Sequence, residues 1–390
     1  MRITVLGGAG KMGSIAVQTL AKDPRVDQVV IADINQEQAQ VVADYLGSPK
    51  IALQQVDIRD QDAFVRSLQG SHALVNATVY YTNLPVMEAC LRAQVPYVDL
   101  GGLFHTTRKQ LELDGRFREV GLSAVLGMGS APGIPNVQAR YAADRLDEVE
   151  SIRIYDGIKP PPPDQMAFTY AVPTILDELT MPPMVFRDGE FMVCEPLSEF
   201  EEQCFTPPLG VLPMHLSLHS EVATLPVSFA EKGVREVFFK INYWGMSRET
   251  VEKVRVLAEF GLNSREPVEV RGQRVAPRDV LMALLADKVP PVTDFLAPPV
   301  NQPPDWTKEI RTDVHGRRDG RPVTYRVSAL TVKGALPTGG APAITAIWLA
   351  EGRIPPGVHP PEQVLEPEPF FQELRELGIV TQVAVTEEVG

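Results

Sequence analysis

The chain has 390 residues, of which 44% are apolar and 22% charged, as is typical of soluble globular proteins with two or three domains. Its net charge of −13 argues against nucleic acid and anionic membranes as partners, because both attract basic surfaces. No apolar run approaches the ~18 residues of a membrane helix. The three cysteines lack C-x-x-C spacing, so we expect no disulfide framework and no metal site. The chain begins directly with a predicted strand, and we expect a cytoplasmic protein without a signal peptide.

The N-terminal segment carries a phosphate-binding pattern. Residues 2–6 predict a short buried strand, Gly8-Ala-Gly10-Lys11-Met12-Gly13 fits G-x-G-x-x-G, and residues 14–20 continue with helical spacing. Such glycines allow a tight turn, a close approach of backbone N–H groups to a pyrophosphate, and close packing of helix on strand. A plain glycine-rich turn could also produce the pattern. The order of strand, glycines and helix favours a nucleotide site.

A second predicted strand, residues 28–33, ends in Asp33. A carboxylate roughly 20 residues beyond the glycines accepts hydrogen bonds from the adenosine ribose and repels a 2′-phosphate. No Arg or Lys follows Asp33 before Lys50, so nothing in this segment would hold such a phosphate. The alternative role of Asp33 is to cap a helix over residues 36–46. Together with the glycines, Asp33 favours NAD over NADP as the cofactor.

Further strands are predicted to alternate with helices. The strands span residues 50–57, 73–78, 95–100 and 123–127, and the helices 60–68, 83–93 and 107–120. Six strands in such alternation predict a parallel, doubly wound sheet, in which ligands bind at the carboxyl ends of the strands. The residues expected around that crevice are Asp33, Asp57, Asn76, Ala77, Asp99, Met128 and Gly129.

The pattern changes after a helix predicted for residues 135–146. Residues 150–156, 236–243 and 321–332 alternate polar and apolar side chains, which indicates half-buried antiparallel strands. Residues 187–189 and 318–320 have the composition of hairpin turns. Helices are predicted at 247–260 and 277–285, and again in the tail at 343–351 and 369–377. The second half is therefore an α+β unit with a mixed, largely antiparallel sheet.

Chemistry outside the glycine pattern is less explicit. The chain has no H-E-x-x-H, G-x-S-x-G or Walker sequence, which removes support for metalloprotease, hydrolase and P-loop functions. His215 and His219 are four residues apart, but their strand-like surroundings disfavour a metal site. His219, Ser220 and Glu221 could hold a substrate amine or act as a base near neutral pH. The alternative is a surface strand or loop with ordinary polar residues.

Five further segments, taken in order after the glycine-rich start, are informative together: residues 75–78, 86–90, 97–102, 131–136 and 357–362. This ordered set resembles the saccharopine dehydrogenase family, and the resemblance covers nearly the whole chain. Within that family, the length and residues 147–151 look closest to lysine 6-dehydrogenase.

The resemblance implies a Rossmann domain, residues 1–132 and 339–390, interrupted by a substrate-binding and dimerisation domain, residues 133–338. It also implies a homodimer or higher oligomer joined through the sheet of the second domain. The residues placed at the cofactor by the motif and the resemblance are Gly8, Gly10, Lys11, Met12, Gly13, Asp33, Asp57, Ile58, Asn76, Ala77, Thr78, Gly101 and Gly102.

The function expected from this resemblance is NAD-dependent oxidation of a C–N bond in an amino acid or related amine. A cationic nitrogen cannot expel hydride, so a base must first deprotonate the amine, and the candidates are Asp99, His219 and Glu221. One alternative is a saccharopine-type reductase that condenses an amine with a carbonyl compound, with Arg153, Arg235 or Arg311 binding carboxylates. Another is a non-catalytic, NAD-binding redox sensor.

Overall fold

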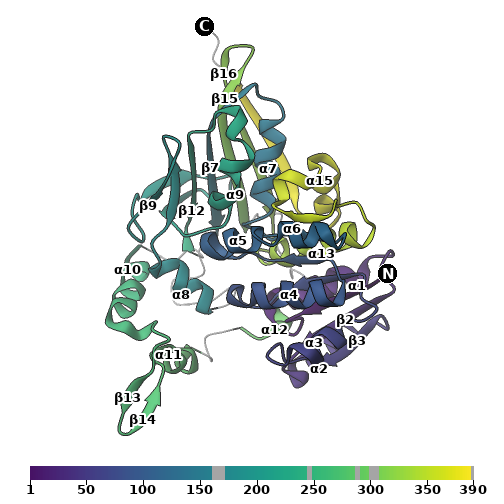
Figure 1. Ribbon diagram of the computed structural model, residues 1–390. Helices are drawn as coiled ribbons and strands as arrows, with labels where there is room; N and C mark the ends of the chain where they lie inside the picture. The colour runs from purple at the N-terminus through teal and green to yellow at the C-terminus, as the bar shows by residue number, and fades with distance from the viewer. Residues whose placement is uncertain (160–171, 244–247, 286–289, 298–306, 388–390) are drawn as a thin grey trace.

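Two β-sheets organise the protein in a computed structural model that describes residues 1–159, 172–243, 248–285, 290–297 and 307–387. The first sheet lies beside the N-terminus in the lower part of Figure 1, and the second rises above it as long, nearly upright strands. Among the described residues, no helix combines the length and hydropathy needed to cross a bilayer.

The first sheet is parallel throughout and has seven strands in the order β17-β6-β5-β4-β1-β2-β3. This confirms the predicted doubly wound Rossmann sheet and adds one strand, β17, to the six predicted. β17 lies between the proline pairs at residues 355–356 and 360–361, which indicate a loop rather than a strand. The strands are β1 Arg2–Leu6, β2 Gln28–Asp33, β3 Ile51–Gln55, β4 Ala73–Asn76, β5 Tyr97–Asp99, β6 Ser123–Val125 and β17 Gly357–His359. The helices are α1 Lys11–Lys22, α2 Gln36–Leu46, α3 Gln61–Ser67, α4 Asn83–Ala93, α5 Leu103–Leu111, α6 Asp114–Glu119 and α13 Leu336–Ala350.

The second sheet has nine strands and is mixed, as predicted. β12 pairs with β7 in parallel, and all other strand pairs of this sheet are antiparallel. The hairpin turns predicted at residues 187–189 and 318–320 join β8 to β9 and β15 to β16. The strands are β7 Glu148–Ile158, β8 Met184–Arg187, β9 Glu190–Val193, β10 Glu201–Cys204, β11 Val211–Leu216, β12 Glu236–Ile241, β15 Lys308–Arg318, β16 Arg321–Thr331 and β18 Val380–Glu387.

One face of the second sheet packs against α7 and α9 around a shared apolar core. A small hairpin, β13 Val268–Val270 and β14 Gln273–Val275, projects from the body at the lower left of Figure 1. The helices of this half are α7 Ile134–Ala143, α8 Val172–Thr180, α9 Glu221–Ser228, α10 Arg248–Leu257, α11 Pro277–Leu285, α12 Val292–Leu296, α14 Pro361–Val364 and α15 Pro367–Glu376.

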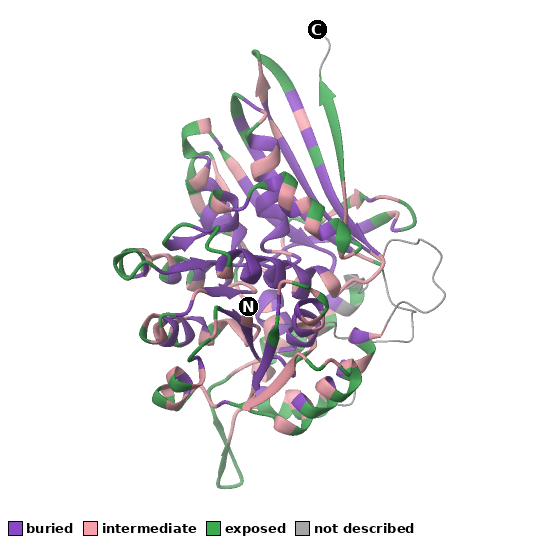
Figure 2. Cartoon of the chain, turned by 90° about the vertical axis from the view of Figure 1, so that its right-hand side faces the viewer, coloured by how far each residue is buried: buried purple, intermediate pink, exposed green. Residues whose placement is uncertain are grey.

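The C-terminal segment contributes to both sheets. Its strand β17 pairs with β6 at the edge of the first sheet, whereas β18 pairs with β16 in the second. Figure 2 shows β18, the strand that leads to the C-terminus, as largely exposed. The tail therefore supplies one strand to each sheet. The domain boundaries stay a prediction.

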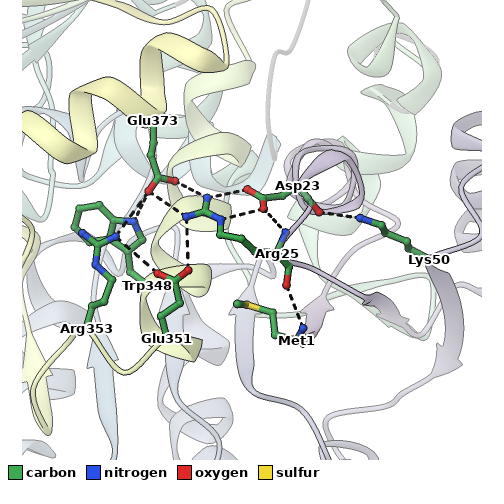
Figure 3. Close-up of polar contacts among 8 residues, drawn as sticks. All are labelled: Met1, Asp23, Arg25, Lys50, Trp348, Glu351, Arg353 and Glu373. Carbon is green, nitrogen blue, oxygen red and sulfur yellow. Dashed lines mark hydrogen bonds and ion pairs between the residues drawn. The ribbon is translucent and has the colours of Figure 1, made fainter.

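A polar network fastens this tail to the N-terminal half (Figure 3). Arg25, just after α1, donates to Asp23 and to Glu373 of α15, and its Nη2–Oε2 distance to Glu373 is 2.8 Å. Glu373 also accepts from the indole of Trp348 in α13 at 2.6 Å. The Arg353 guanidinium lies 3.5 Å from the centre of the Trp348 ring. Two helices of the tail are thereby tied to the loop that connects α1 and β2.

Candidate functional site

The glycine-rich loop between β1 and α1 can come close to a pyrophosphate. Gly10 caps α1 and has no side chain that could accept hydrogen bonds from the backbone donors of the first turn, which suits an anion-binding helix N-terminus. A Cβ on Gly13 would lie 2.1 Å from the Gly7 carbonyl oxygen, so only glycine allows the helix to pack this closely. Gly7 makes the turn with a φ of +75°, and a Cβ there would meet the Ala77 backbone at 3.0 Å. Sequence reasoning did not assign Gly7, although its place directly after the strand marks it as the turn glycine.

Two polar side chains border the glycine loop. Asp33, at the end of β2, accepts the Ala9 N–H at 3.1 Å and the Asn35 N–H at 3.0 Å, so it holds the loop from the side where an adenosine ribose would lie. Lys11 lies over the Phe295 ring of α12 at 4.9 Å, and burial lowers the pKa of its ammonium to about 8. Lys11 therefore joins the phosphate loop to α12.

Asp57 and Ile58 follow β3, next to the end of β2. The Asp57 carboxylate is paired with Arg59 at the surface, and these hydrogen bonds lower its pKa to about 2. Asp57 is ionised at neutral pH and already has a cationic partner.

Asn76 and Asp99 lie in one buried hydrogen-bond cluster at the ends of β4 and β5. The Asn76 amide donates to Asn83 and to the Tyr97 hydroxyl, and its oxygen accepts from Thr78. Ala77 donates its N–H to the carbonyl of Leu6. These contacts hold the residues after β4 against the glycine loop.

The Asp99 carboxylate is the centre of this cluster and is 1% exposed. Burial raises its pKa, and the hydrogen bonds donated to it oppose that rise. Both oxygens have donors, so the Asp99 carboxylate links the ends of β5 and β6 to α4 and α5. Its donors are Asn83, Tyr97, Gln110 and the backbone N–H groups of Gly101 and Gly127.

The carboxyl ends of β5 and β6 meet the second half of the chain at Ser220. The Ser220 hydroxyl oxygen lies 3.6 Å from the point that a Cβ would occupy on Gly101 or on Gly127. A Cβ at either glycine would also collide with Pro132, at 2.8 and 2.9 Å. Gly102 caps α5, where a Cβ would lie 2.5 Å from the Gln110 amide oxygen. Small residues thus bring the loop before α9 directly over the first sheet.

His219 and Glu221 form a buried acid–base pair beside Ser220. The imidazole Nδ1 lies 2.5 Å from the Glu221 carboxylate, and the ring stacks on Phe239 with centroids 3.8 Å apart. His219 is 5% and Glu221 0% exposed. Among the described residues, Glu221 Oε1 and Ser220 Oγ have no hydrogen-bond partner. Buried polar atoms without partners are uncommon and call for an explanation, and a ligand that bonds them is one.

The charges around His219 are mainly negative. Burial lowers the pKa of the imidazole, but the carboxylates of Glu221, Glu178 and Asp156 raise it, and the net direction is upward. The site therefore favours a cation, either imidazolium or an ammonium group of a ligand.

The alternative expectation of a surface strand or loop at residues 219–221 was wrong, because these side chains are buried and Glu221 begins α9. The sequence of α9, with three β-branched residues and Pro226, has low helix propensity. Burial against β12 and α5 outweighs that propensity. Sequence reasoning did not assign Phe239, on which the His219 imidazole stacks, to the site, because Phe239 lies in a segment that looks like any other buried strand.

The arginines considered for carboxylate binding do not face His219. Arg153 pairs with Glu236, and Arg235 is largely exposed beside Asp188. Arg311 lies over the rings of Tyr155 and Phe205, in a separate apolar cluster.

Two sequence segments that carried the resemblance meet across the molecule. Asn136 of α7 donates to Glu362 of α14 at 2.8 Å, and Ser228 of α9 donates to the same carboxylate at 2.8 Å. Burial raises the pKa of Glu362. The two segments brace α9, and with it the His219–Glu221 pair.

Comparisons with known proteins fit this architecture. The family model described as saccharopine dehydrogenase NADP binding domain matches residues 3–125, and the saccharopine dehydrogenase C-terminal domain matches residues 129–379. The chain belongs to the saccharopine dehydrogenase family. This confirms the predicted family and an oxidoreductase whose cofactor is a nicotinamide dinucleotide.

Curated relatives of this saccharopine dehydrogenase family protein cover most of its length. Carboxyaminopropylagmatine dehydrogenase of Synechocystis is 24% identical and spans 97% of this chain and 96% of its own. Carboxynorspermidine synthase of Vibrio cholerae is 26% identical over 85% of this chain and 82% of its own.

Two solved structures share the fold. Apo saccharopine dehydrogenase (L-Glu forming) of Saccharomyces cerevisiae superposes with a TM-score of 0.71 at 17% identity, over 99% of each chain. Homospermidine synthase of Legionella pneumophila in complex with NAD gives 0.65 at 13%, over 99% of this chain and 91% of that one.

Proposed function

We propose that this protein is a dehydrogenase that forms or oxidises the secondary amine of a carboxylated polyamine. The observation that carries the proposal is the buried His219–Glu221 pair, whose Glu221 Oε1 has no hydrogen-bond partner among the described residues. The two curated relatives, named for carboxyaminopropylagmatine and carboxynorspermidine, suggest the substrate class.

His219 is proposed to move the proton. With Nδ1 directed at Glu221, Nε2 is the ring atom that accepts a proton from the substrate ammonium. Glu221 and the neighbouring carboxylates stabilise the imidazolium that forms, so the amine reaches its neutral state inside the site. The nicotinamide, when bound, supplies the hydride acceptor. In the reductive direction His219 returns its proton to the amine nitrogen.

The cofactor is proposed to lie along the carboxyl edge of the first sheet. Gly8, Gly10 and Gly13 would admit the pyrophosphate, and Asp33 would bind the ribose, which favours NAD over NADP. Asp99 is proposed as a positioning residue that holds Gly101 and Gly127 beneath Ser220, rather than as the base. Dimerisation through the second sheet stays a prediction.

The test is absorbance at 340 nm with NAD or NADP and a panel of carboxynorspermidine, carboxyaminopropylagmatine, saccharopine and lysine. We expect reduction of the cofactor with a carboxylated polyamine. Turnover of lysine alone would establish a lysine 6-dehydrogenase instead. Tight cofactor binding without turnover of any amine would establish the redox sensor.

A further inference from the structure

A buried ion pair of the second sheet affects the proton transfer only through the charge of Asp156, which helps to raise the pKa of His219. Lys308 opens β15 and Asp156 lies near the end of β7, with Nζ and Oδ2 2.9 Å apart. Lys308 is 5% and Asp156 3% exposed. Among the described residues, Asp156 Oδ1 has no hydrogen-bond partner.

The pair lies on the same face of the sheet as His219. Asp156 of β7 is aligned with Ile241 of β12. Phe239 lies two residues before Ile241 on β12, and the His219 ring stacks on it. Directly opposed residues and residues two apart share a face, so Asp156 and Phe239 point the same way. Asp156 and Phe239 are separated by about 7 Å along the strand direction and by about 5 Å, the spacing of neighbouring strands, across the sheet. A small, extended ligand would span that distance.

An incomplete buried pair calls for an explanation, because removing two charges from water is costly unless their hydrogen bonds are satisfied. Asp313, on the same β15, shows the complete arrangement: Arg326 donates to both of its oxygens, at 2.9 and 3.0 Å. Asp156 has a comparable cationic partner but leaves one oxygen free of hydrogen bonds.

A cation and an anion side by side complement a zwitterion. We propose that Lys308 and Asp156 bind the α-amino-acid end of the substrate, with the carboxylate on Lys308 Nζ and the α-ammonium on Asp156 Oδ1. This subsite rests on the proposed function, in which the secondary amine lies at His219. It also supplies the carboxylate-binding cation that Arg153, Arg235 and Arg311 do not provide at this face.

Three small probes separate the two contacts. 2,4-Diaminobutyrate carries both groups, 1,3-diaminopropane lacks only the carboxylate, and 4-aminobutyrate lacks only the α-amine. Calorimetry on the NADH-bound protein is expected to show 2,4-diaminobutyrate binding at least about ten-fold more tightly than either truncated probe. K308M should abolish the preference over 1,3-diaminopropane, and D156N the preference over 4-aminobutyrate.

The matched control is K240M, which removes a lysine that is also 5% exposed and paired with a carboxylate, Glu201, on the opposite face. It should leave both preferences intact. If K308M does not fold, the uncharged double variant D156N/K308M should bind all three probes with similar affinity, because neither contact remains.

Equal affinity of the wild type for all three probes would overturn the subsite, as would an equal loss for all three in K308M. A different result would contradict the proposed function and leave the subsite standing: the probe preferences hold, but no amine of the panel measured at 340 nm is turned over.

Discussion

Asp99 and Glu221 are two buried carboxylates on opposite sides of one junction, and they differ in how completely their oxygens are bonded. Asp99 accepts hydrogen bonds at both oxygens from side chains and backbone of the first half. Glu221 bonds His219 with one oxygen and has no partner among the described residues for the other. A fully bonded carboxylate stabilises the fold, whereas an incompletely bonded one is available to a ligand.

The largest expected effect is on stability at Asp99. D99N replaces an accepting oxygen with a donor that faces other donors, so we expect the free energy of unfolding to fall by about 3–5 kcal/mol. Urea denaturation measures it. D27N, at a surface carboxylate that is 86% exposed, is the control and should stay within about 0.5 kcal/mol. A loss of activity in D99N at wild-type stability would instead make Asp99 part of the chemistry.

E221Q should show the opposite behaviour. It keeps an acceptor for His219 but removes the charge, so kcat/KM for the amine should fall about 10²–10³-fold while the free energy of unfolding hardly changes. Steady-state kinetics and urea denaturation on the same preparation measure both. E201Q, at the carboxylate paired with Lys240, is the control. An unchanged kcat/KM would remove Glu221 from the site.

The pH profile sharpens the comparison further. Because the pKa of His219 is raised, kcat/KM for amine oxidation should increase with pH through a midpoint above the ordinary histidine value of about 6.5. In E221Q the lost charge no longer opposes burial, so the midpoint should move to lower pH. A raised histidine pKa also stabilises the fold at low pH and loses this contribution as pH rises through it. An identical midpoint in both proteins would contradict the pairing.

Asp33 is intermediate, since each of its oxygens accepts one backbone N–H and the residue is half-buried. D33N keeps an acceptor but removes the charge that repels a 2′-phosphate. We expect the ratio of kcat/KM for NADP to that for NAD to rise about ten-fold. Initial rates with both cofactors test it, and an unchanged ratio would show that Asp33 only holds the loop.

The smallest effect is expected at Glu373, a bonded carboxylate near the surface (Figure 3). E373Q weakens its bonds to Arg25 and Trp348, which should lower the free energy of unfolding by about 1 kcal/mol and leave kcat/KM unchanged. Thermal unfolding monitored by tryptophan fluorescence reports it. A change in kcat/KM would mean that the tail affects the site.

The sequence predicted what depends on neighbours along the chain. The glycine loop, Asp33 and the parallel sheet follow from local spacing, and the two hairpin turns from their dipeptides. The bonding of Asp99 could not be predicted, because its donors include Gln110 and Gly127, which only the folded chain brings to it. The helix that begins at Glu221 was missed because packing, not propensity, forms it.

The split of the tail between two sheets has a consequence for synthesis. The N-terminal sheet receives its last strand, β17, only after residue 359 has been made, although its other six strands are complete by residue 125. A nascent chain therefore exposes the edge of β6 while the whole second sheet except β18 is translated. Unpaired strand edges promote aggregation, so the edge of β6 is a liability until the segment that contains β17 has been made and has paired with it.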